Sequence, residues 1–206
     1  MSQFFQIHPD NPQPRLINRA VEILQQGGVI AYPTDSSYAL GCHIDDKAAM
    51  ERLARIRQVS NRHNFTLMCR DLSEIASYAK VGNQEYRLVK SLTPGPFTFI
   101  LKASREVPRR LQNPKRKTIG LRVPENRIAL ALLEELNEPI MSSTLILPGQ
   151  EFPMTDAEEI REQLEHFVDL VIDGGHCVNE PTTVIDLSDS TVEITRQGRG
   201  VYTNAN

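Results

Sequence analysis

Val29-Ile30-Ala31-Tyr32-Pro33-Thr34-Asp35-Ser36-Ser37-Tyr38-Ala39-Leu40-Gly41-Cys42 is the stretch that decides how this chain folds. Its apolar start, residues 29–32, predicts a short buried strand, and Pro33 ends the pairing because proline has no amide hydrogen to donate. Three hydroxyl residues and one carboxylate follow at 34–37. Hydroxyls and amides at a strand end suit a bound carboxylate or phosphate, because each donates a hydrogen bond to an anion. A Ser/Asp turn between two strands explains the same residues without a ligand, so both interpretations stay open.

Patterns on either side of this stretch predict a mixed α/β fold. Helices are expected from apolar spacing and capping residues at 16–24, 46–56, 71–79, 83–91, 126–136 and 155–167. Strands or extended segments are expected at 65–69, 97–101, 119–123, 139–147, 168–172, 183–187 and 192–195. Strands alternate with helices but also follow one another directly near the end. We therefore expect a single α/β domain, residues 1–206, with helices packed against a twisted mixed sheet.

Length and composition fit a globular protein with a full core. The chain has 206 residues, of which 40% are hydrophobic and 24% charged. No apolar run approaches the roughly 18 residues of a membrane-spanning helix, and the N-terminus lacks the pattern of a signal peptide. Cys42, Cys69 and Cys177 are odd in number and far apart, as is usual for free thiols in a reducing cytoplasm. We expect a cytoplasmic protein without a membrane partner, and the oligomeric state stays open.

Common catalytic motifs are absent from the sequence. It contains no G-x-x-x-x-G-K-[ST], G-x-G-x-x-G or G-x-S-x-G segment. The histidines are scattered without the spacing of metal ligands, so we expect no protein-bound metal and interpret each as a surface or satisfied residue. They are His8, His43, His63, His166 and His176. Hydroxyls and arginines at strand ends remain, and such groups position and neutralise anions rather than supply a nucleophile.

One basic cluster, residues 105–117, interrupts an otherwise acidic chain of net charge −3. It holds six cations against one carboxylate. The cations that we expect to contact RNA phosphates are Arg109, Arg110, Lys115, Arg116 and Lys117. An ordinary solvated loop has the same composition, and that alternative stays open.

Five segments resemble motifs of the YrdC-like family, also called the threonylcarbamoyl-AMP synthase family, and they occur in the family's order. The segments are 32–42 (YPTDSSYALGC, against YPTDT-x-YGLGC), 94–98 (PGPFT), 119–124 (IGLRVP, against GxRxP), 181–186 (PTTVID, against STV-x-D) and 196–198 (RQG, against RxG). Each motif alone is weak, whereas five in register form a specific signal. The resemblance implies the YrdC-like fold, a twisted α/β sheet with a large concave surface. It also implies a site at which founding members condense L-threonine, bicarbonate and ATP into threonylcarbamoyl-adenylate, which feeds the N6-threonylcarbamoyladenosine modification of tRNA.

The resemblance also implies roles for individual residues. Those that would hold the threonine-like substrate are Thr34, Ser36 and Arg122. Those that would lie on the nucleotide side are Arg55, Arg57, Ser143, Thr144, Thr183 and Arg196. Among these, the catalytic candidates are Arg55 and Arg57, which stand where the family has K-x-R, and Thr144. The expected substrate is ATP with Mg²⁺, and no protein ligands are predicted for the metal.

Departures from the family pattern bear on activity. When 142–149 is aligned with the family's STSAN-x-SG, Thr144 keeps a hydroxyl, but Ile146 replaces an asparagine. Losing such a hydrogen bond is worth about 1.5–3 kcal/mol, or roughly ten- to a hundredfold in rate. Ala39 replaces a glycine, and about two extra residues occur in 60–64.

From these departures we expect weak or redirected threonylcarbamoyl chemistry, including removal of the group from tRNA, combined with binding of tRNA or double-stranded RNA. The alternative is a non-catalytic protein that binds double-stranded RNA or tRNA and keeps a relic nucleotide pocket.

Overall fold

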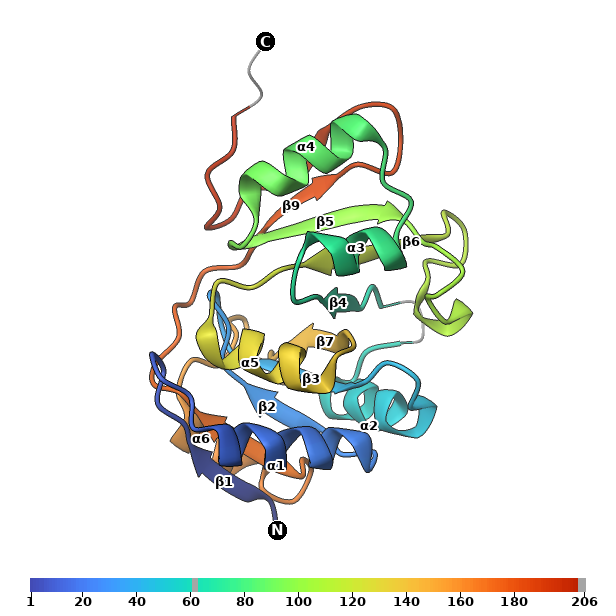
Figure 1. Ribbon diagram of the computed structural model, residues 1–206. Helices are drawn as coiled ribbons and strands as arrows, with labels where there is room; N and C mark the ends of the chain where they lie inside the picture. Colours follow the sequence, from blue (N-terminus) through green and yellow to red (C-terminus); the bar gives the residue numbers. More distant parts are fainter. Residues whose placement is uncertain (61–62, 204–206) are drawn as a thin grey trace.

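A mixed sheet of ten strands forms the centre of the computed structural model, which describes residues 1–60 and 63–203 (Figure 1). The strands are β1 (Gln3–Gln6), β2 (Ile30–Tyr32), β3 (Ala39–His43), β4 (Thr66–Met68), β5 (Phe97–Lys102), β6 (Thr118–Arg122), β7 (Ile140–Thr144), β8 (Leu170–Asp173), β9 (Thr183–Asp186) and β10 (Glu193–Arg196). Their order across the sheet is β1-β8-β2-β3-β7-β4-β6-β5-β9-β10. The sheet contains both parallel pairs, such as β4 with β6, and antiparallel pairs, such as β3 with β7. The expected single-domain α/β fold with a mixed sheet is confirmed.

Several of the helices begin at a side-chain cap. They are α1 (Pro14–Gln25), α2 (Lys47–Arg57), α3 (Leu72–Tyr78), α4 (Asn83–Leu92), α5 (Arg127–Leu136) and α6 (Ala157–Leu164), with a short 3₁₀ helix at Arg109–Leu111. The side chains of Asp46, Asn126 and Asp156 each accept a hydrogen bond from the backbone amide three residues further on. Such a cap satisfies one of the amide groups that a helix start leaves without a partner.

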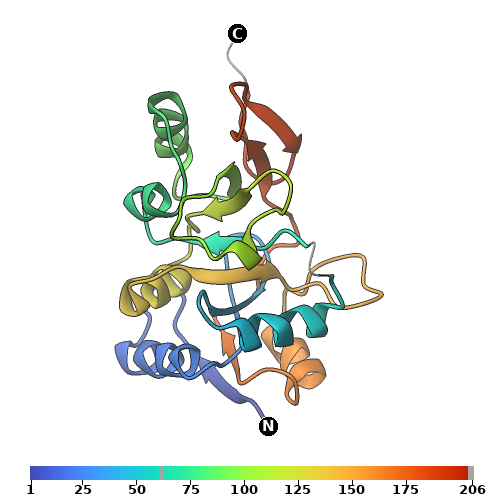
Figure 2. The same cartoon turned by 90° about the vertical axis from the view of Figure 1, so that its right-hand side faces the viewer.

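Two layers of helices cover the half of the sheet around β2. Ile30 and Tyr32 pack in a core cluster with residues of α1 and α5, whereas Val29 and Ala31 share a second cluster with residues of α2 and α6. Because successive side chains along a strand point to opposite faces, the two helix pairs lie on opposite sides of the sheet. Figure 2 shows this arrangement, with α1 and α5 in blue and yellow on the left and α2 and α6 in cyan and orange on the right.

Several boundaries differ from those predicted. The N-terminal segment, for which no strand is predicted, forms β1 and pairs in parallel with β8 at the edge of the sheet. The helix expected to reach Phe167 ends at Leu164, and the Phe167 side chain is exposed. The final residues of 139–147 leave the sheet after Thr144 as a loop. In the part of the chain that the structure describes, no helix combines the length and apolar character needed to cross a membrane.

Gly41 in β3 allows a close approach within the decisive stretch. A Cβ atom at this position would lie 2.7 Å from Ile140 Cγ2 and 2.8 Å from Tyr32 Cε1. Real Cβ atoms do not come so close to other heavy atoms, so only glycine lets these side chains pack over the strand. The buried Tyr32 hydroxyl in turn lies 2.7 Å from Ser142 Oγ. This hydrogen bond ties β2 to β7 beside the site described below.

Candidate functional site

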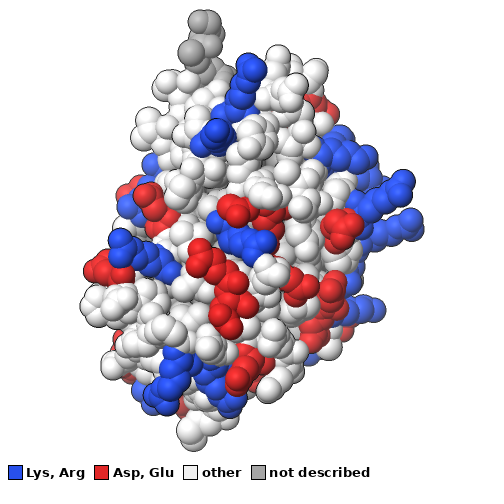
Figure 3. All heavy atoms as spheres, viewed as in Figure 1, with Lys and Arg blue, Asp and Glu red and all other residues white. Residues whose placement is uncertain are grey.

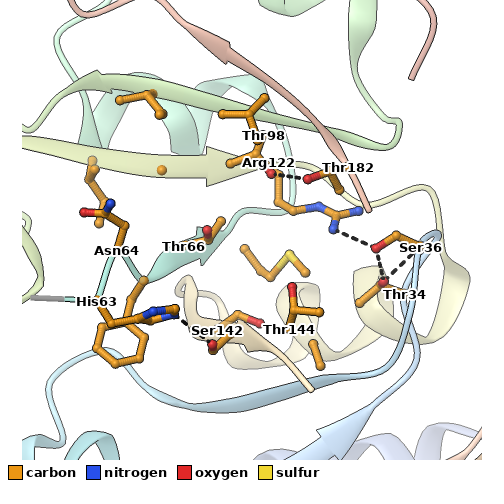
Figure 4. Close-up of a pocket in the computed structure, with 18 of the residues that line it drawn as sticks. Thr34, Ser36, His63, Asn64, Thr66, Thr98, Arg122, Ser142, Thr144 and Thr182 are labelled. Carbon is orange, nitrogen blue, oxygen red and sulfur yellow. Dashed lines mark hydrogen bonds between the residues drawn. The ribbon is translucent and has the colours of Figure 1, made fainter. Parts of the chain in front are cut away.

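A cavity of about 380 Å³ opens on one face of the sheet (Figure 4). Alternate residues of neighbouring strands line it, among them Thr66 and Met68 of β4 and Gly120 and Arg122 of β6. Ser and Thr hydroxyls dominate its polar surface. Its charged lining residues are Arg57, Arg116, Arg122 and Arg196, and the described lining includes no Asp or Glu. Guanidinium groups together with hydroxyls favour a bound anion that carries a carboxylate or a phosphate.

Arg122 and the turn after β2 form one end of the cavity. Thr34 Oγ1 donates to the carbonyl of Ser37 at 2.6 Å and accepts from the Ser36 amide at 3.1 Å, so the turn holds its own hydroxyl in place. The buried Arg122 guanidinium pairs through Nη2 with Asp35, whose carboxylate also accepts from the Glu125 amide at 2.9 Å. Arg122 Nη1 lies 3.4 Å from Ser36 Oγ. Among the described residues, Arg122 Nε has no hydrogen-bond partner, so this guanidinium keeps a free donor.

Arg57, His63 and Ser143 form the opposite end. Arg57 Nη1 donates to Ser143 Oγ, and Arg57 Nε donates to the carbonyl of Ile146 at 3.3 Å. His63 Nε2 lies 3.2 Å from Arg57 Nη1 and 3.3 Å from Ser143 Oγ. Burial lowers the pKa of Arg57, and burial followed by the charge of Arg57 lowers the pKa of His63. Figure 4 places His63 and Asn64 across the cavity from Thr34, Ser36 and Arg122.

The strands β5, β9 and β10 close a third side. Arg196 donates from Nε to the carbonyl of Thr182 and from Nη2 to Thr182 Oγ1, both at 2.9 Å. Thr182 Oγ1 also lies 2.8 Å from Thr98 Oγ1. Burial, with the nearby charge of Arg122 as the smaller cause, lowers the pKa of Arg196. These contacts hold the Arg196 guanidinium in one orientation at the cavity wall.

The structure brings most of the predicted site residues together. Those that line the cavity are Thr34, Ser36, Arg57, Arg122, Ser143, Thr144 and Arg196. Arg55 does not join them, because successive helical residues are rotated by about 100° and Arg55 therefore points away from Arg57. It is exposed and lines a separate shallow hollow with Glu51 and Gln58. The structure therefore gives no support to the catalytic and nucleotide-binding roles predicted for Arg55.

Thr183 is a second correction, and strand alternation explains it. Its neighbours Thr182 and Val184 face the cavity, whereas Thr183 is fully buried on the other side. Thr183 Oγ1 donates to the carbonyl of Gly200 at 2.6 Å and accepts from the amide of Gly198 at 2.9 Å. The hydroxyl expected to meet the nucleotide therefore anchors the segment after β10, and Thr182 supplies the hydroxyl at the cavity.

Some cations of the predicted RNA-contact cluster already form bonds within the protein, so only part of the cluster is available for RNA. Arg109, Lys115 and Lys117 are exposed, but Arg110 Nη2 donates to the carbonyl of Ile44 at 2.7 Å. Arg116 turns toward the cavity and pairs with the buried carboxylate of Asp186 at 2.8 Å, which raises the pKa of Arg116. Figure 3 shows basic and acidic side chains intermixed on the face seen in Figure 1, with basic side chains projecting at the right-hand edge, where the loop between β5 and β6 lies.

His63, Thr182 and Arg116 are cavity residues that the sequence analysis did not assign to the pocket. His63 was interpreted as a scattered histidine, although it lies within 60–64, where the chain departs from the family pattern. That departure is the one signal that could have identified it. Nowhere in the described ranges do three or more His, Cys, Asp or Glu residues group in a way that could hold a metal ion.

Comparisons with known proteins connect this geometry to a family. The family model for Sua5, YciO and YrdC, described as telomere recombination, matches residues 22–198. The YciO protein of Escherichia coli K12 is 64% identical over 200 residues, which are 97% of each chain. The crystal structure of E. coli YciO has a TM-score of 0.94 at 63% identity and covers 98% of both chains. The structure of P. abyssi Sua5 complexed with L-threonine has a TM-score of 0.88 at 25% identity, covering 96% of this chain and 58% of that one.

Proposed function

The chain belongs to the Sua5/YciO/YrdC family, and on that premise we propose that its cavity binds an adenine nucleotide together with a threonine-like carboxylate. The observation that carries the proposal is the meeting of four guanidinium groups and many hydroxyls in one cavity whose described lining lacks carboxylates. Its volume of about 380 Å³ lies within the range of small-molecule sites. The likeness to P. abyssi Sua5, whose structure contains L-threonine, supports the amino-acid part.

The two ends of the cavity suit the two parts of the ligand. At one end, Thr34, Ser36 and Arg122 offer hydroxyls and a buried guanidinium for the carboxylate. Asp35 neutralises this guanidinium in the free protein, so the ligand does not have to compensate an isolated buried charge. At the other end and along the wall, Arg57, Ser143, Thr144 and Arg196 would bind the phosphates. This division gives each anionic group at least one charged donor.

The chemistry at this site is proposed to be weak or redirected threonylcarbamoyl transfer linked to tRNA. Ile146 lines the cavity, and its carbonyl contacts Arg57. Its side chain is apolar where the family motif has an amide that could orient phosphate or bicarbonate oxygens. The binding groups persist without this orienting amide, which favours slow synthesis of the adenylate or the reverse direction, removal of threonylcarbamoyl from tRNA. Mg²⁺ would arrive with the nucleotide phosphates as part of the substrate.

Two reactions test the direction. The protein is incubated with ATP, L-threonine and bicarbonate, and release of pyrophosphate and formation of the adenylate are measured. In parallel it is incubated with tRNA carrying N6-threonylcarbamoyladenosine, and loss of the modification is followed by mass spectrometry. Arg57→Ala should slow whichever reaction occurs by at least about tenfold, whereas Arg55→Ala, on the same helix but outside the cavity, should leave it unchanged. Absence of both reactions would contradict the enzymatic proposal.

The exposed cations of the loop between β5 and β6 favour a second candidate function, binding of double-stranded RNA or tRNA without catalysis. Of the predicted RNA-contact residues, Arg109, Lys115, Arg116 and Lys117 are exposed, and Arg116 pairs with Asp186, which leaves three exposed cations for RNA. Each phosphate neutralised on a duplex contributes about −0.9 to the slope of log affinity against log salt, so these cations predict a slope of about −3. Replacing all three by Gln should flatten it. RNA binding with this slope but without any nucleotide binding would favour the relic-pocket alternative.

We place these activities in the cytoplasm. Cys42, Cys69 and Cys177 are free thiols in the structure, and burial raises the pKa of Cys177 to about 11 and that of Cys42 to about 12. Such thiols persist in a reducing compartment, where ATP and tRNA are also present. Recovery of the protein in a cytoplasmic fraction would test this placement.

A further inference from the structure

His63 lies where a bound phosphate would meet Arg57, and no family motif assigns it a role. It belongs to the segment in which this chain departs from the family pattern, and its ring lines the cavity. Phe65 supports the ring edge-on, with 5.0 Å between ring centroids and 74° between planes. The imidazole is therefore held in the cavity wall and does not swing freely in solvent.

The hydrogen-bond geometry fixes the state of His63 in the free protein. Arginine has only donors, so the 3.2 Å contact between Arg57 Nη1 and His63 Nε2 requires Nε2 to accept. An accepting Nε2 carries no proton, so the hydrogen-bond geometry assigns a neutral imidazole to His63. Burial and the charge of Arg57, which lower the pKa of His63, act in the same direction. Ser143 Oγ, which accepts from Arg57 and lies 3.3 Å from Nε2, completes the three-residue cradle.

An anion that binds in this cradle of Arg57, His63 and Ser143 shifts the protonation equilibrium of His63. It would accept the hydrogen bond from Arg57 and partly neutralise the charge that, after burial, disfavours protonation of His63. A protonated Nε2 could then donate to the anion, which gives the cradle a second cationic donor. We propose that His63 takes up a proton when a phosphate-like anion binds beside Arg57, so that the anion affinity of this end of the cavity rises as the pH falls. The inference deepens the proposed nucleotide site and rests on it.

Among the described residues, few other groups around His63 could explain such a pH dependence. The charged group that faces it from α2 is Arg57, which stays protonated over the pH range of interest. From β7 it meets the hydroxyl of Ser143, and its own segment contributes the amide of Asn64 and the ring of Phe65. The remaining cavity cations, Arg116, Arg122 and Arg196, are also arginines, and the described lining has no carboxylate. Among the described lining residues, His63 is therefore the one whose ordinary pKa lies between 5 and 8.

The expected size of the effect follows from linkage. An opposite charge within about 4–6 Å raises the pKa of a cationic group by about 1–3 units. For each unit by which the pKa rises, the protonated imidazole binds the anion ten times more tightly than the neutral imidazole does. Sulfate affinity should therefore rise between pH 8 and pH 5.5, by at most about tenfold for each unit by which the bound anion raises the pKa of His63. Sulfate is the suitable probe because its own charge does not change over this range, unlike that of a terminal phosphate.

The test is a sulfate titration at constant ionic strength. Binding is measured by calorimetry, and the protonation of His63 is measured by NMR of the histidine ring protons. Wild-type protein should bind sulfate more tightly at pH 5.5, and His63→Gln should bind it with equal affinity at both pH values. His166→Gln, at an exposed histidine, is the matched control and should behave as the wild type. If the variant fails to fold, the His63 ring in the wild-type protein still reports, because its pKa should rise when sulfate is added.

The outcomes separate this inference from the proposed function. A wild-type protein with pH-independent sulfate binding, or a His63→Gln variant that keeps the pH dependence, would overturn the role of His63. Proton-linked sulfate binding without any binding of ATP would leave the cradle in place and would contradict the nucleotide proposal.

Discussion

Removing the carboxylate of Asp35 should destabilise the protein strongly, because it leaves the buried guanidinium of Arg122 without its partner. The two side chains are 7% and 6% exposed. Breaking a buried ion pair from one side costs about 3–5 kcal/mol. For a protein of about 200 residues, each kcal/mol lowers Tm by about 2–4 °C, so Asp35→Ala should lower it by about 6–20 °C. Asp35→Asn, which keeps an acceptor for the Glu125 amide, should cost less.

Thermal and urea denaturation of matched variants measures this effect. The control is Asp189→Ala, because Asp189 pairs with Arg116 at 3.4 Å but its side chain is 71% exposed. Exposed pairs contribute at most about 1 kcal/mol, so this variant should lose less than about 4 °C. Equal losses of stability in Asp35→Ala and Asp189→Ala would refute the reasoning, since burial would then make no difference to the value of the pair.

Three further predictions concern the core and the site. Ile146→Asn should raise the rate of adenylate formation roughly ten- to a hundredfold by restoring an orienting amide, measured as pyrophosphate release with Ile146→Val as control. Gly41→Ala should lower the free energy of unfolding by about 1–3 kcal/mol in urea denaturation, because its Cβ would overlap Ile140 and Tyr32. Because the folded-state pKa of His63 is lowered, the unfolded chain binds more protons below about pH 6.5. Stability should therefore fall as the pH drops from 6.5 through the folded-state pKa, and His63→Gln should reduce this slope.

Sequence patterns predict those parts of the fold that depend on interactions between residues close together in the chain. Asp46, Asn126 and Asp156 cap helices because each accepts from an amide three residues away, an interaction that the sequence displays directly. The pairing of β1 with β8 joins residues more than 160 positions apart, such as Gln3 and Leu170. No spacing in the sequence encodes such a contact, because it depends on which edge of the finished sheet is left open.

In the candidate site, too, motifs predict some features, whereas others depend on how the strands are ordered and packed. Thr34 and Arg122 were found through motifs, but their meeting in one cavity depends on the order of strands in the sheet. The motifs also assign Arg55 and Thr183 to the site. Helix rotation and strand alternation, however, place both side chains outside the cavity. His63 escaped prediction because its position depends on packing against Arg57 and β7, not on any periodic pattern.

A calorimetric titration of ATP, with the variants Arg57→Ala and Arg55→Ala, tests the central claim most directly. Both arginines end the same helix, but only Arg57 lines the cavity. A hydrogen bond to a charged group is worth about 1.5–3 kcal/mol, so Arg57→Ala should weaken ATP binding roughly 10- to 150-fold. Arg55→Ala should bind ATP as the wild type does. Equal weakening in both variants, or no heat of binding in the wild-type protein, would contradict a nucleotide site in this cavity.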